Sequence, residues 1–339
     1  MRAAVLHGPG PPDSFVIEDV PVPRPGRDDV LVKVEACGVS YRDVVERNGT
    51  YKRDVVYPSI LGLEISGTVV ETGEDVLDLA PGDHVCSKAF ISCGHCRLCR
   101  SGRETTCRRR QPVRGGYAEY VALPQDAFVK VPDSIPFEMS CSLGPGAGVA
   151  LNALRDTANV RIGETVLVTG ASGGVGVPAV QIAKAAGARV FALTRGEGKR
   201  AFLEGIGADE VIVAGDGENF SKEVRRRTGG EGVDIVVDNV GSRVFDACFD
   251  SLAVHGRYAM VGQLFGEEIS INPARIFFKR ASILGVGSVS RAQLEDVIAL
   301  TARGIVTPQV AEILPLEQVA RAHRLVEEGA VSGRVVLKP

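Results

Sequence analysis

Residues 165–176 read TVLVTGASGGVG, a short apolar run that leads directly into a glycine-rich turn. The pattern predicts a buried strand over 165–169 and a helix over 177–186 that ends at Gly187. Counted from Ala171, the turn matches A-x-G-x-x-G, whose glycines permit a sharp bend and let a pyrophosphate reach backbone N–H groups at a helix N-terminus. Dinucleotide binding is therefore predicted for Ala171, Ser172, Gly173, Gly174, Val175 and Gly176. The alternative, a glycine-rich connection that binds nothing, is disfavoured by the strand–turn–helix context.

Apolar strands and helical segments keep alternating after this turn. Further strands are expected over 189–194, 210–213, 233–237, 258–261 and 283–286. Near-continuous apolar strands separated by helices are typical of a doubly wound parallel sheet. The fold class is therefore α/β, with a Rossmann-type dinucleotide-binding domain over 148–286.

The first 147 residues follow a different pattern. Short β-branched runs such as 30–34 and 65–70 are separated by proline, glycine and aspartate, which indicates a mostly antiparallel β domain. Beyond residue 286, a helix over 292–303 and a last strand over 335–337 are expected. We expect residues 287–339 to return to the first domain.

The end of the second parallel strand predicts the cofactor type. NAD-binding enzymes place an acidic residue there for the ribose 2′-hydroxyl, but this chain has Thr194 followed by Arg195, with Lys199 close behind. A missing carboxylate beside basic groups favours a 2′-phosphate, so NADPH is expected ahead of NADH. A solvated basic turn is the alternative.

Half of the eight cysteines lie within fifteen positions, in a lobe expected over about 86–112. Four thiolates on a short, turn-rich loop are typical of tetrahedral zinc without an open coordination position, which makes the ion structural. The spacing departs from the ferredoxin pattern at its fourth member, which argues against an iron–sulfur cluster. The predicted ligands of one structural Zn²⁺ are Cys93, Cys96, Cys99 and Cys107; unrelated thiols are the alternative. Cys37, Cys86, Cys141 and Cys248 are expected to be core or semi-buried thiols.

Composition excludes several classes of protein. The 339 residues are 45% hydrophobic and carry a net charge of −3, so a disordered chain and a nucleic-acid binder are not expected. No apolar run reaches the roughly 18 residues of a membrane span, and the N-terminal apolar run is too short for a signal peptide. A cytoplasmic protein without nucleic-acid or membrane partners is expected. His84 and His95 are expected in surface loops.

Taken together, residues 38–43, 62–64, 82–85, the four-cysteine lobe and 173–176 resemble the medium-chain dehydrogenase/reductase superfamily over essentially the whole chain. The resemblance implies a GroES-like catalytic domain, a Rossmann cofactor domain, and a homodimer or homotetramer. It also implies backbone contacts to the nicotinamide side of the cofactor from Val240, Gly241, Val261 and Gly262, and a place for Arg334 near the pyrophosphate.

The departures from this family are informative. Alcohol dehydrogenases of the family hold a second, catalytic zinc, and their cysteine and histidine ligands correspond to Ser40 and Leu63 here. The third ligand falls at about Gly146, and Arg42 occupies the place of their hydroxyl proton relay. A leucine cannot bind a metal, and the one remaining carboxylate, Glu64, does not make a zinc site. A catalytic zinc is therefore not expected.

Without that ion, reduction of an activated C=C bond is the expected reaction, because conjugation spreads the developing charge into an enolate that hydrogen-bond donors can stabilise. Zinc-free relatives are mostly quinone and enoyl reductases, and the resemblance is to acryloyl-CoA reductase-like proteins. We expect Tyr41 to donate the proton, Ser40 to donate a hydrogen bond to the carbonyl and Asp43 to orient the loop. Alternatives are a packing role for Tyr41, a proton from water, an alcohol dehydrogenase with an atypical metal site, and a non-catalytic NADPH-binding protein.

Overall fold

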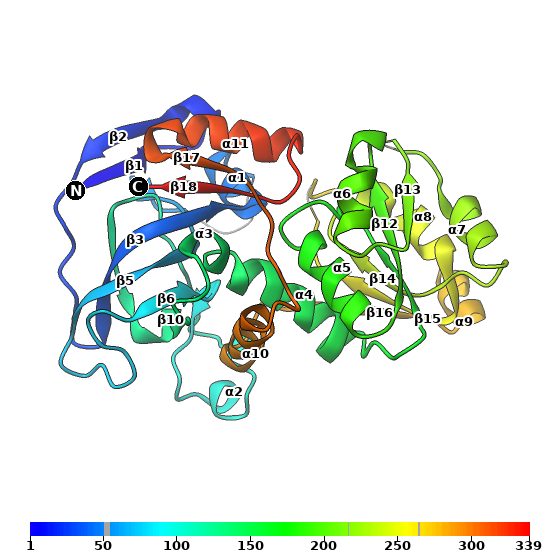
Figure 1. Ribbon diagram of the computed structural model, residues 1–339, viewed down its shortest axis with the longest axis horizontal. Coiled ribbons are helices and arrows are strands. Elements are labelled where there is room, and N and C mark those ends of the chain that lie inside the picture. Colours follow the sequence, from blue (N-terminus) through cyan, green and yellow to red (C-terminus); the bar gives the residue numbers. More distant parts are fainter. Residues whose placement is uncertain (51–54, 216, 264) are drawn as a thin grey trace. The chain divides into compact units, whose positions relative to one another are not determined.

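The computed structural model describes residues 1–50, 55–215, 217–263 and 265–339 (Figure 1). The chain divides into two compact units. The first contains Met1–Gly148, Ser288–Gly304 and Pro308–Pro339, and the second contains Val149–Gly287 with Ile305–Thr307.

The second unit is built on a six-stranded, wholly parallel sheet in the order β13-β12-β11-β14-β15-β16. The strands are β11 (Thr165–Val168), β12 (Arg189–Thr194), β13 (Glu210–Val213), β14 (Val233–Asp238), β15 (Leu252–Met260) and β16 (Ser282–Gly285). The predicted parallel sheet is thereby confirmed. Strand order reverses between β11 and β14, which are neighbours in the sheet although β12 and β13 lie between them in the sequence.

Helices connect these strands because each crossover between parallel strands must pass over the sheet. They are α5 (Gly176–Ala185), α6 (Arg200–Gly205), α7 (Ser221–Arg227), α8 (Ser242–Ser251) and α9 (Pro273–Lys279), and the short helix α4 (Val149–Leu151) precedes β11. The sheet's apolar side chains are buried against them, with Phe191, Val236 and Tyr258 fully inaccessible. This burial explains the near-continuous apolar strands in the sequence.

The first unit contains a mostly antiparallel seven-stranded sheet, which confirms the predicted mainly antiparallel domain. Its main path is β10-β6-β5-β3-β18-β17, and β9 also pairs with β3. The strands are β3 (Asp29–Val39), β5 (Glu64–Thr72), β6 (His84–Ser87), β9 (Tyr120–Pro124), β10 (Phe128–Lys130), β17 (Val310–Pro315) and β18 (Arg334–Lys338). The last strand of the chain, β18, pairs with β3 and β17 (Figure 1).

Smaller elements complete this unit. The short strands are β1 (Arg2–Leu6), β2 (Phe15–Asp19), β4 (Ser59–Ile60), β7 (Phe90–Ile91) and β8 (Gln111–Pro112). The helices are α1 (Tyr41–Arg47), α2 (Arg97–Arg100), α3 (Phe137–Ser140), α10 (Arg291–Ala302) and α11 (Val319–Glu328). No helix in the described ranges combines the length and apolar character needed to span a bilayer.

The expected surface position of His84 is wrong. His84 begins β6 and is only 7% exposed, and its Nε2 lies 3.1 Å from Ser66 Oγ and 3.0 Å from Ser140 Oγ. Burial lowers the pKa of His84, which favours the neutral ring in these hydrogen bonds. The turn at Pro81 and Gly82 ends before His84, which already pairs with Thr68 of β5. His95, by contrast, is exposed.

Candidate functional site

The four cysteines of the lobe converge on one point. Their Sγ atoms all lie within 4.8 Å of one another, and the closest pairs are 3.5–3.9 Å apart. Four sulfurs at about 2.3 Å from a tetrahedral zinc ion would be about 3.8 Å apart. The cluster therefore fits a Cys₄ zinc site, as the sequence predicts.

Local structure explains the convergence. Gly94 and Gly102 both adopt φ of +70°, which reverses the chain on either side of the short helix α2. Cys96 is the N-cap of α2, and Cys99 lies within it. Backbone hydrogen bonding from His95 and then Cys96 lowers the pKa of Cys93 to about 6, which favours the thiolate that binds metal.

The glycine turn is shaped by close backbone packing. Gly170 has φ of +55°, and its carbonyl accepts a hydrogen bond from Gly173 N–H at 2.9 Å. A Cβ atom at Gly176 would lie 2.2 Å from Gly170 O and 2.6 Å from the Cα of Ala171, so only glycine fits at the start of α5. The turn thus brings the N-terminus of α5 against the end of β11, as a pyrophosphate site requires.

A basic side chain contacts this turn. Lys199 Nζ donates to Ser172 Oγ at 3.2 Å, while Thr194 ends β12 nearby in sequence and is buried. Burial lowers the pKa of Lys199, and the positive charge of Arg195 lowers it further. Two cations are therefore close enough to repel each other, an arrangement that an anionic ligand would stabilise.

The four predicted nicotinamide-side residues surround Asp238, the last residue of β14. Its Oδ1 accepts from the N–H groups of Val240 (3.0 Å) and Gly241 (3.1 Å), and its backbone carbonyl accepts from those of Val261 (2.9 Å) and Gly262 (3.1 Å). Asp238 is therefore the residue that assembles these two segments. Asp238 was not among the predicted site residues, although an acidic residue that ends an apolar strand was a visible signal.

Two further side chains fix the Asp238 carboxylate. Thr169 Oγ1 donates to its Oδ1 and Tyr258 OH donates to its Oδ2, both at 2.7 Å. Asp238 and Tyr258 are both fully buried, and burial raises the pKa of the Tyr258 hydroxyl, which remains a donor. This network joins the carboxyl ends of β11, β14 and β15.

In the first unit, Ser40 and Asp43 form a capping box at the start of α1. Ser40 Oγ donates to Asp43 Oδ2 at 2.6 Å, and Asp43 Oδ1 accepts from Gly62 N–H at 3.2 Å. Asp43 thereby links the loop before α1 to the segment that contains Leu63. Tyr41, the third predicted residue, is the first residue of α1 and is partly exposed.

Leu63, which corresponds to the zinc-binding histidine discussed above, and the adjacent carboxylate Glu64 are both buried. Leu63 is 3% exposed and belongs to the apolar core, whereas Glu64 begins β5 and is inaccessible. Arg334 Nη2 lies 2.8 Å from Glu64 Oε1, and Arg334 Nη1 donates to the carbonyl of Val39 at 3.3 Å. Burial raises the pKa of Glu64 to about 7 despite the opposing effect of Arg334. Arg334, predicted to lie near the pyrophosphate, is therefore engaged with Glu64.

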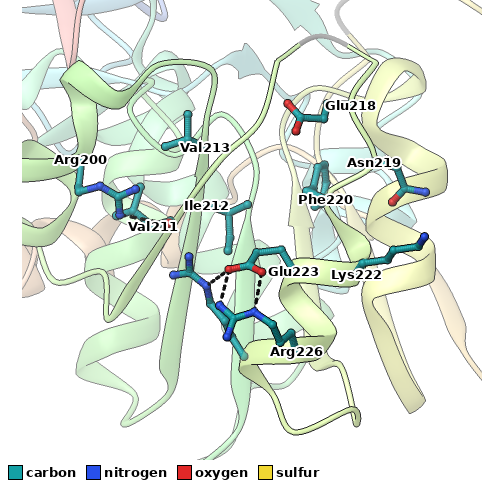
Figure 2. A pocket seen from close by; sticks show the side chains of 11 residues that line it. Arg200, Val211, Ile212, Val213, Glu218, Asn219, Phe220, Lys222, Glu223 and Arg226 are labelled. Carbon is teal, nitrogen blue, oxygen red and sulfur yellow. Dashed lines mark hydrogen bonds and ion pairs between the residues drawn. The ribbon is translucent and has the colours of Figure 1, made fainter.

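A cavity of about 450 Å³ lies beside β13 and α7 in the second unit (Figure 2). No predicted site residue lines it; the lining residues are Arg200, Val211, Ile212, Val213, Glu218, Asn219, Phe220, Lys222, Glu223, Arg226 and Arg227.

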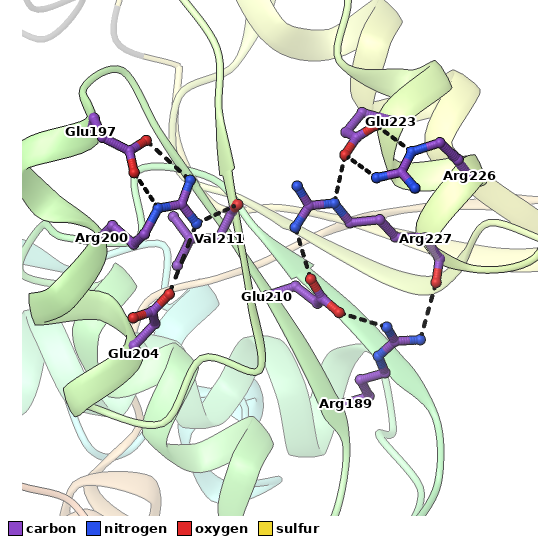
Figure 3. A network of polar contacts seen from close by, with 9 residues as sticks. All are labelled: Arg189, Glu197, Arg200, Glu204, Glu210, Val211, Glu223, Arg226 and Arg227. Carbon is purple, nitrogen blue, oxygen red and sulfur yellow. Dashed lines mark hydrogen bonds and ion pairs between the residues drawn. The ribbon is translucent and has the colours of Figure 1, made fainter.

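Ion pairs organise the rim of this cavity (Figure 3). Arg227 contacts both Glu223 and Glu210 at 2.7 Å, and Arg189 contacts Glu210 at 2.8 Å. Hydrogen bonds from Arg226 and then Arg227 lower the pKa of Glu223 to about 2. The arginines are thus largely neutralised by carboxylates, which is typical of a solvated surface network.

Comparison with known proteins identifies two family models in the chain. The model described as "Alcohol dehydrogenase GroES-like domain" matches residues 26–133, and the model described as "Zinc-binding dehydrogenase" matches residues 174–303. These matches fall in the antiparallel and the parallel sheet, respectively.

Several known proteins are similar over nearly their whole length. An acryloyl-coenzyme A reductase of Sulfurisphaera tokodaii is 35% identical, with 100% of both chains covered. An alcohol dehydrogenase of Geobacillus stearothermophilus is 33% identical, with 100% of this chain and 99% of the other covered. A quinone oxidoreductase of Lama guanicoe is 32% identical, with 99% and 97% covered.

Solved structures share the architecture. The crystal structure of AibC has a TM-score of 0.93 at 42% identity, and the match covers 100% of this chain and 96% of that one. A mycobacterial protein solved in complex with NADPH has a TM-score of 0.84 at 29% identity, with 100% of both chains covered.

Proposed function

Because the chain belongs to the medium-chain dehydrogenase/reductase superfamily, we propose that it is an NADPH-dependent reductase of activated C=C bonds, with enoyl thioesters such as acryloyl-CoA ahead of quinones and enones. The observation that carries this proposal is the side-chain chemistry where related alcohol dehydrogenases bind catalytic zinc. Leu63 is an apolar core residue, and Glu64 is paired with Arg334. Leucine has no donor atom and one carboxylate alone does not make a zinc site, so this set suits a reaction in which charge spreads into an enolate.

Asp43 can control when Ser40 donates to the substrate. In its ionised form Asp43 accepts the Ser40 hydroxyl hydrogen. Burial raises the pKa of Asp43, although the hydrogen bonds from Ser40 oppose this shift. A protonated Asp43 would donate to Ser40 Oγ instead, and the Ser40 hydrogen would then be available to an enolate oxygen. We assign Tyr41, which follows Ser40 in the sequence, as the donor of the proton to the α-carbon of the substrate.

The second unit would bind the cofactor, which supplies the hydride. The glycine turn 171–176 would hold the pyrophosphate, while Thr194, Arg195 and Lys199 would bind the 2′-phosphate. The fit rests on the Gly176 packing and on the two neighbouring cations. The NADPH complex of a structural relative supports the same cofactor.

The other components are a structural zinc and a second copy of the chain. The cysteine cluster would hold one Zn²⁺ in the lobe and take no part in the chemistry. We propose a homodimer or homotetramer, supported by Phe277 and Phe278, which are 62% and 75% exposed on α9, the helix that precedes the edge strand β16 in the sequence. Eight unpaired cysteines support a reducing compartment, which we propose is the cytoplasm.

A substrate screen with both cofactors tests this proposal. Oxidation of NADPH would be followed with acryloyl-CoA, crotonyl-CoA, naphthoquinone and simple aldehydes as acceptors. The expected order of kcat/KM places enoyl thioesters first and NADPH above NADH. Preference for aldehydes, together with two zinc ions per chain, would favour an alcohol dehydrogenase instead. Saturable NADPH binding without turnover of any acceptor would indicate a non-catalytic binding protein.

A further inference from the structure

Asn239 lies where the strand order of the parallel sheet reverses. Thr169 follows β11 and Asn239 follows β14, and these two strands are neighbours in the sheet. In open parallel sheets, ligands bind outside the carboxyl ends of the strands at such a reversal point. Asn239 is therefore placed beside the expected ligand by topology alone.

The hydrogen bonds of Asn239 define the orientation of its amide. Its backbone N–H donates to Thr169 Oγ1 at 2.9 Å, and its Nδ2 donates to the carbonyl of Thr169 at 2.7 Å. Since a carbonyl oxygen only accepts, the atom facing Thr169 O must be the nitrogen, and Oδ1 points elsewhere.

The Oδ1 atom is buried and has no hydrogen-bond partner in the part of the chain that the structure describes. A buried carbonyl oxygen without a donor is unfavourable and uncommon in folded proteins, because it has lost its hydrogen bonds to water. A hydrogen-bond donor from a bound ligand would satisfy this acceptor, since the described residues provide none.

The neighbours of Asn239 indicate which ligand group comes near it. A Cβ atom at Gly170 would have Asn239 Cβ at 3.5 Å and Val240 Cγ2 at 3.6 Å as its nearest contacts. Asn239 thus stands between the glycine turn and the Val240–Gly241 segment, with the proposed pyrophosphate site on one side and the proposed nicotinamide side on the other.

We propose that Asn239 Oδ1 accepts a hydrogen bond from a hydroxyl of the ribose that carries the nicotinamide. This inference rests on the proposed NADPH-dependent function. The phosphates of the cofactor are acceptors and cannot satisfy a carbonyl oxygen. The adenine half is assigned to Lys199 and Thr194 at the end of β12, on the opposite side of β11 from β14. The nicotinamide ribose is then the nearest part of the cofactor that offers hydroxyl donors.

Binding of two ligands distinguishes loss of this hydrogen bond from a general disruption of the glycine turn. Adenosine 2′,5′-bisphosphate carries the adenine half of NADPH but lacks the nicotinamide ribose. In Asn239→Leu, which approximately keeps the side-chain volume, we expect the Kd for NADPH to rise roughly tenfold. The Kd for adenosine 2′,5′-bisphosphate should be unchanged. Isothermal titration calorimetry of the purified full chain measures both constants, and Asn239→Ala provides a second variant with less steric bulk.

Asn272→Ala is the matched control in the same unit. Asn272 Oδ1 caps α9 by accepting from Ala274 N–H at 2.9 Å, so this variant should lose thermal stability without a change in either Kd. An unchanged NADPH affinity in both Asn239 variants would overturn the inference. Equal weakening of both ligands would also overturn it, since that result indicates a structural role. Failure of the wild-type chain to bind NADPH would instead overturn the proposed function.

Discussion

Glu64 and Arg334 form a buried ion pair inside the first unit, with Glu64 Oε1 2.8 Å from Arg334 Nη2. The pair is incompletely satisfied, since Glu64 Oε2 and Arg334 Nε lack hydrogen-bond partners among the described residues. The backbone is adapted to this carboxylate, because a Cβ at Gly38 would lie 2.3 Å from Oε2. Such burial makes the charge on Glu64 costly, and the stability of the unit should therefore depend on pH.

Glu64→Gln should change that pH dependence. The pKa of Glu64 is raised from 4.5 to about 7, so between these values the folded chain holds a proton that the unfolded chain has released. Stability from this group is therefore present below pH 4.5 and is lost as the pH rises through 7. The loss is on the order of 3 kcal/mol, and glutamine, which stays neutral, should avoid it.

Urea unfolding of the wild type and Glu64→Gln at pH 5, 6, 7 and 8 measures this difference. The free energy of unfolding of the variant, relative to that of the wild type, should increase as the pH rises. Glu71→Gln, at an exposed position of the same strand, controls for the loss of one negative charge. Parallel pH profiles for wild type and Glu64→Gln would contradict the assignment.

Cys99→Ser should remove the metal from the lobe. Elemental analysis of the wild type is expected to give one zinc per chain, and the variant should retain none, with a lower Tm because the site helps fold the loop. Cys141→Ala, a buried thiol outside the lobe, should keep the zinc. Retention of zinc by Cys99→Ser would show that the cluster is not the binding site.

Lys199→Ala should weaken discrimination between the two cofactors. Losing a charge-assisted bond to the 2′-phosphate should raise the KM for NADPH roughly 10- to 100-fold, while the KM for NADH should change little. Steady-state kinetics with both cofactors measure the ratio. Lys222→Ala, in the cavity beside α7, is the control and should change neither constant. Equal losses with both cofactors would refute a 2′-phosphate contact.

Gly176→Ala should destabilise the second unit and abolish cofactor binding. The added methyl would lie 2.2 Å from Gly170 O and 2.6 Å from the Cα of Ala171. Both are backbone atoms, which cannot move aside independently. The free energy of unfolding should fall by about 2 kcal/mol or more, which lies in the upper part of the range for overpacked buried sites. Gly205→Ala, where a Cβ meets nothing within 4 Å, should be near neutral. Thermal denaturation with and without NADPH compares the two variants.

Tyr41→Phe tests the proton donor. If Tyr41 delivers the proton to the α-carbon, kcat should fall by about 10²–10⁴ while the Kd for NADPH stays constant. Tyr120→Phe on β9 removes a hydroxyl from the same unit and should retain the wild-type rate. A fully active Tyr41→Phe variant would assign the proton to water or to another group and leave the reaction class unchanged.

The sequence was most informative where one strong local constraint acts. Five of the six parallel strands were predicted to within one residue at each end, whereas β15 begins six residues before the expected position. The inner strands β11, β12 and β14 are recognisable because burial of both faces makes them almost continuously apolar. The cysteine lobe was predicted because four soft ligands in a short loop have few other uses. The glycine at position 176 has a local cause of the same kind, because its packing against Gly170 leaves no room for a side chain.

Interactions between distant segments were not predictable in the same way. Asp238 assembles Val240–Gly241 with Val261–Gly262 through one carboxylate and one carbonyl, and a single sequence gives no measure of such pairing. The same holds for the Glu64–Arg334 pair and for His84, whose hydrogen-bond partners Ser66 and Ser140 lie on other elements. These groups acquire their roles only when tertiary structure removes water from around them.

The position of β18 has a consequence for biosynthesis. Arg334 in this strand bonds to Val39 across 295 residues of chain, and β18 fills the space between β3 and β17. Because translation proceeds from the N-terminus, β3 can pair with β18 only after residues 334–338 have been synthesised. Residues 149–287, by contrast, emerge as an almost uninterrupted block that can close its own sheet earlier. The unit that is begun first is therefore completed last, and until then residues 37–39 of β3 lack the strand that pairs with them, whereas residues 29–33 can already pair with β9.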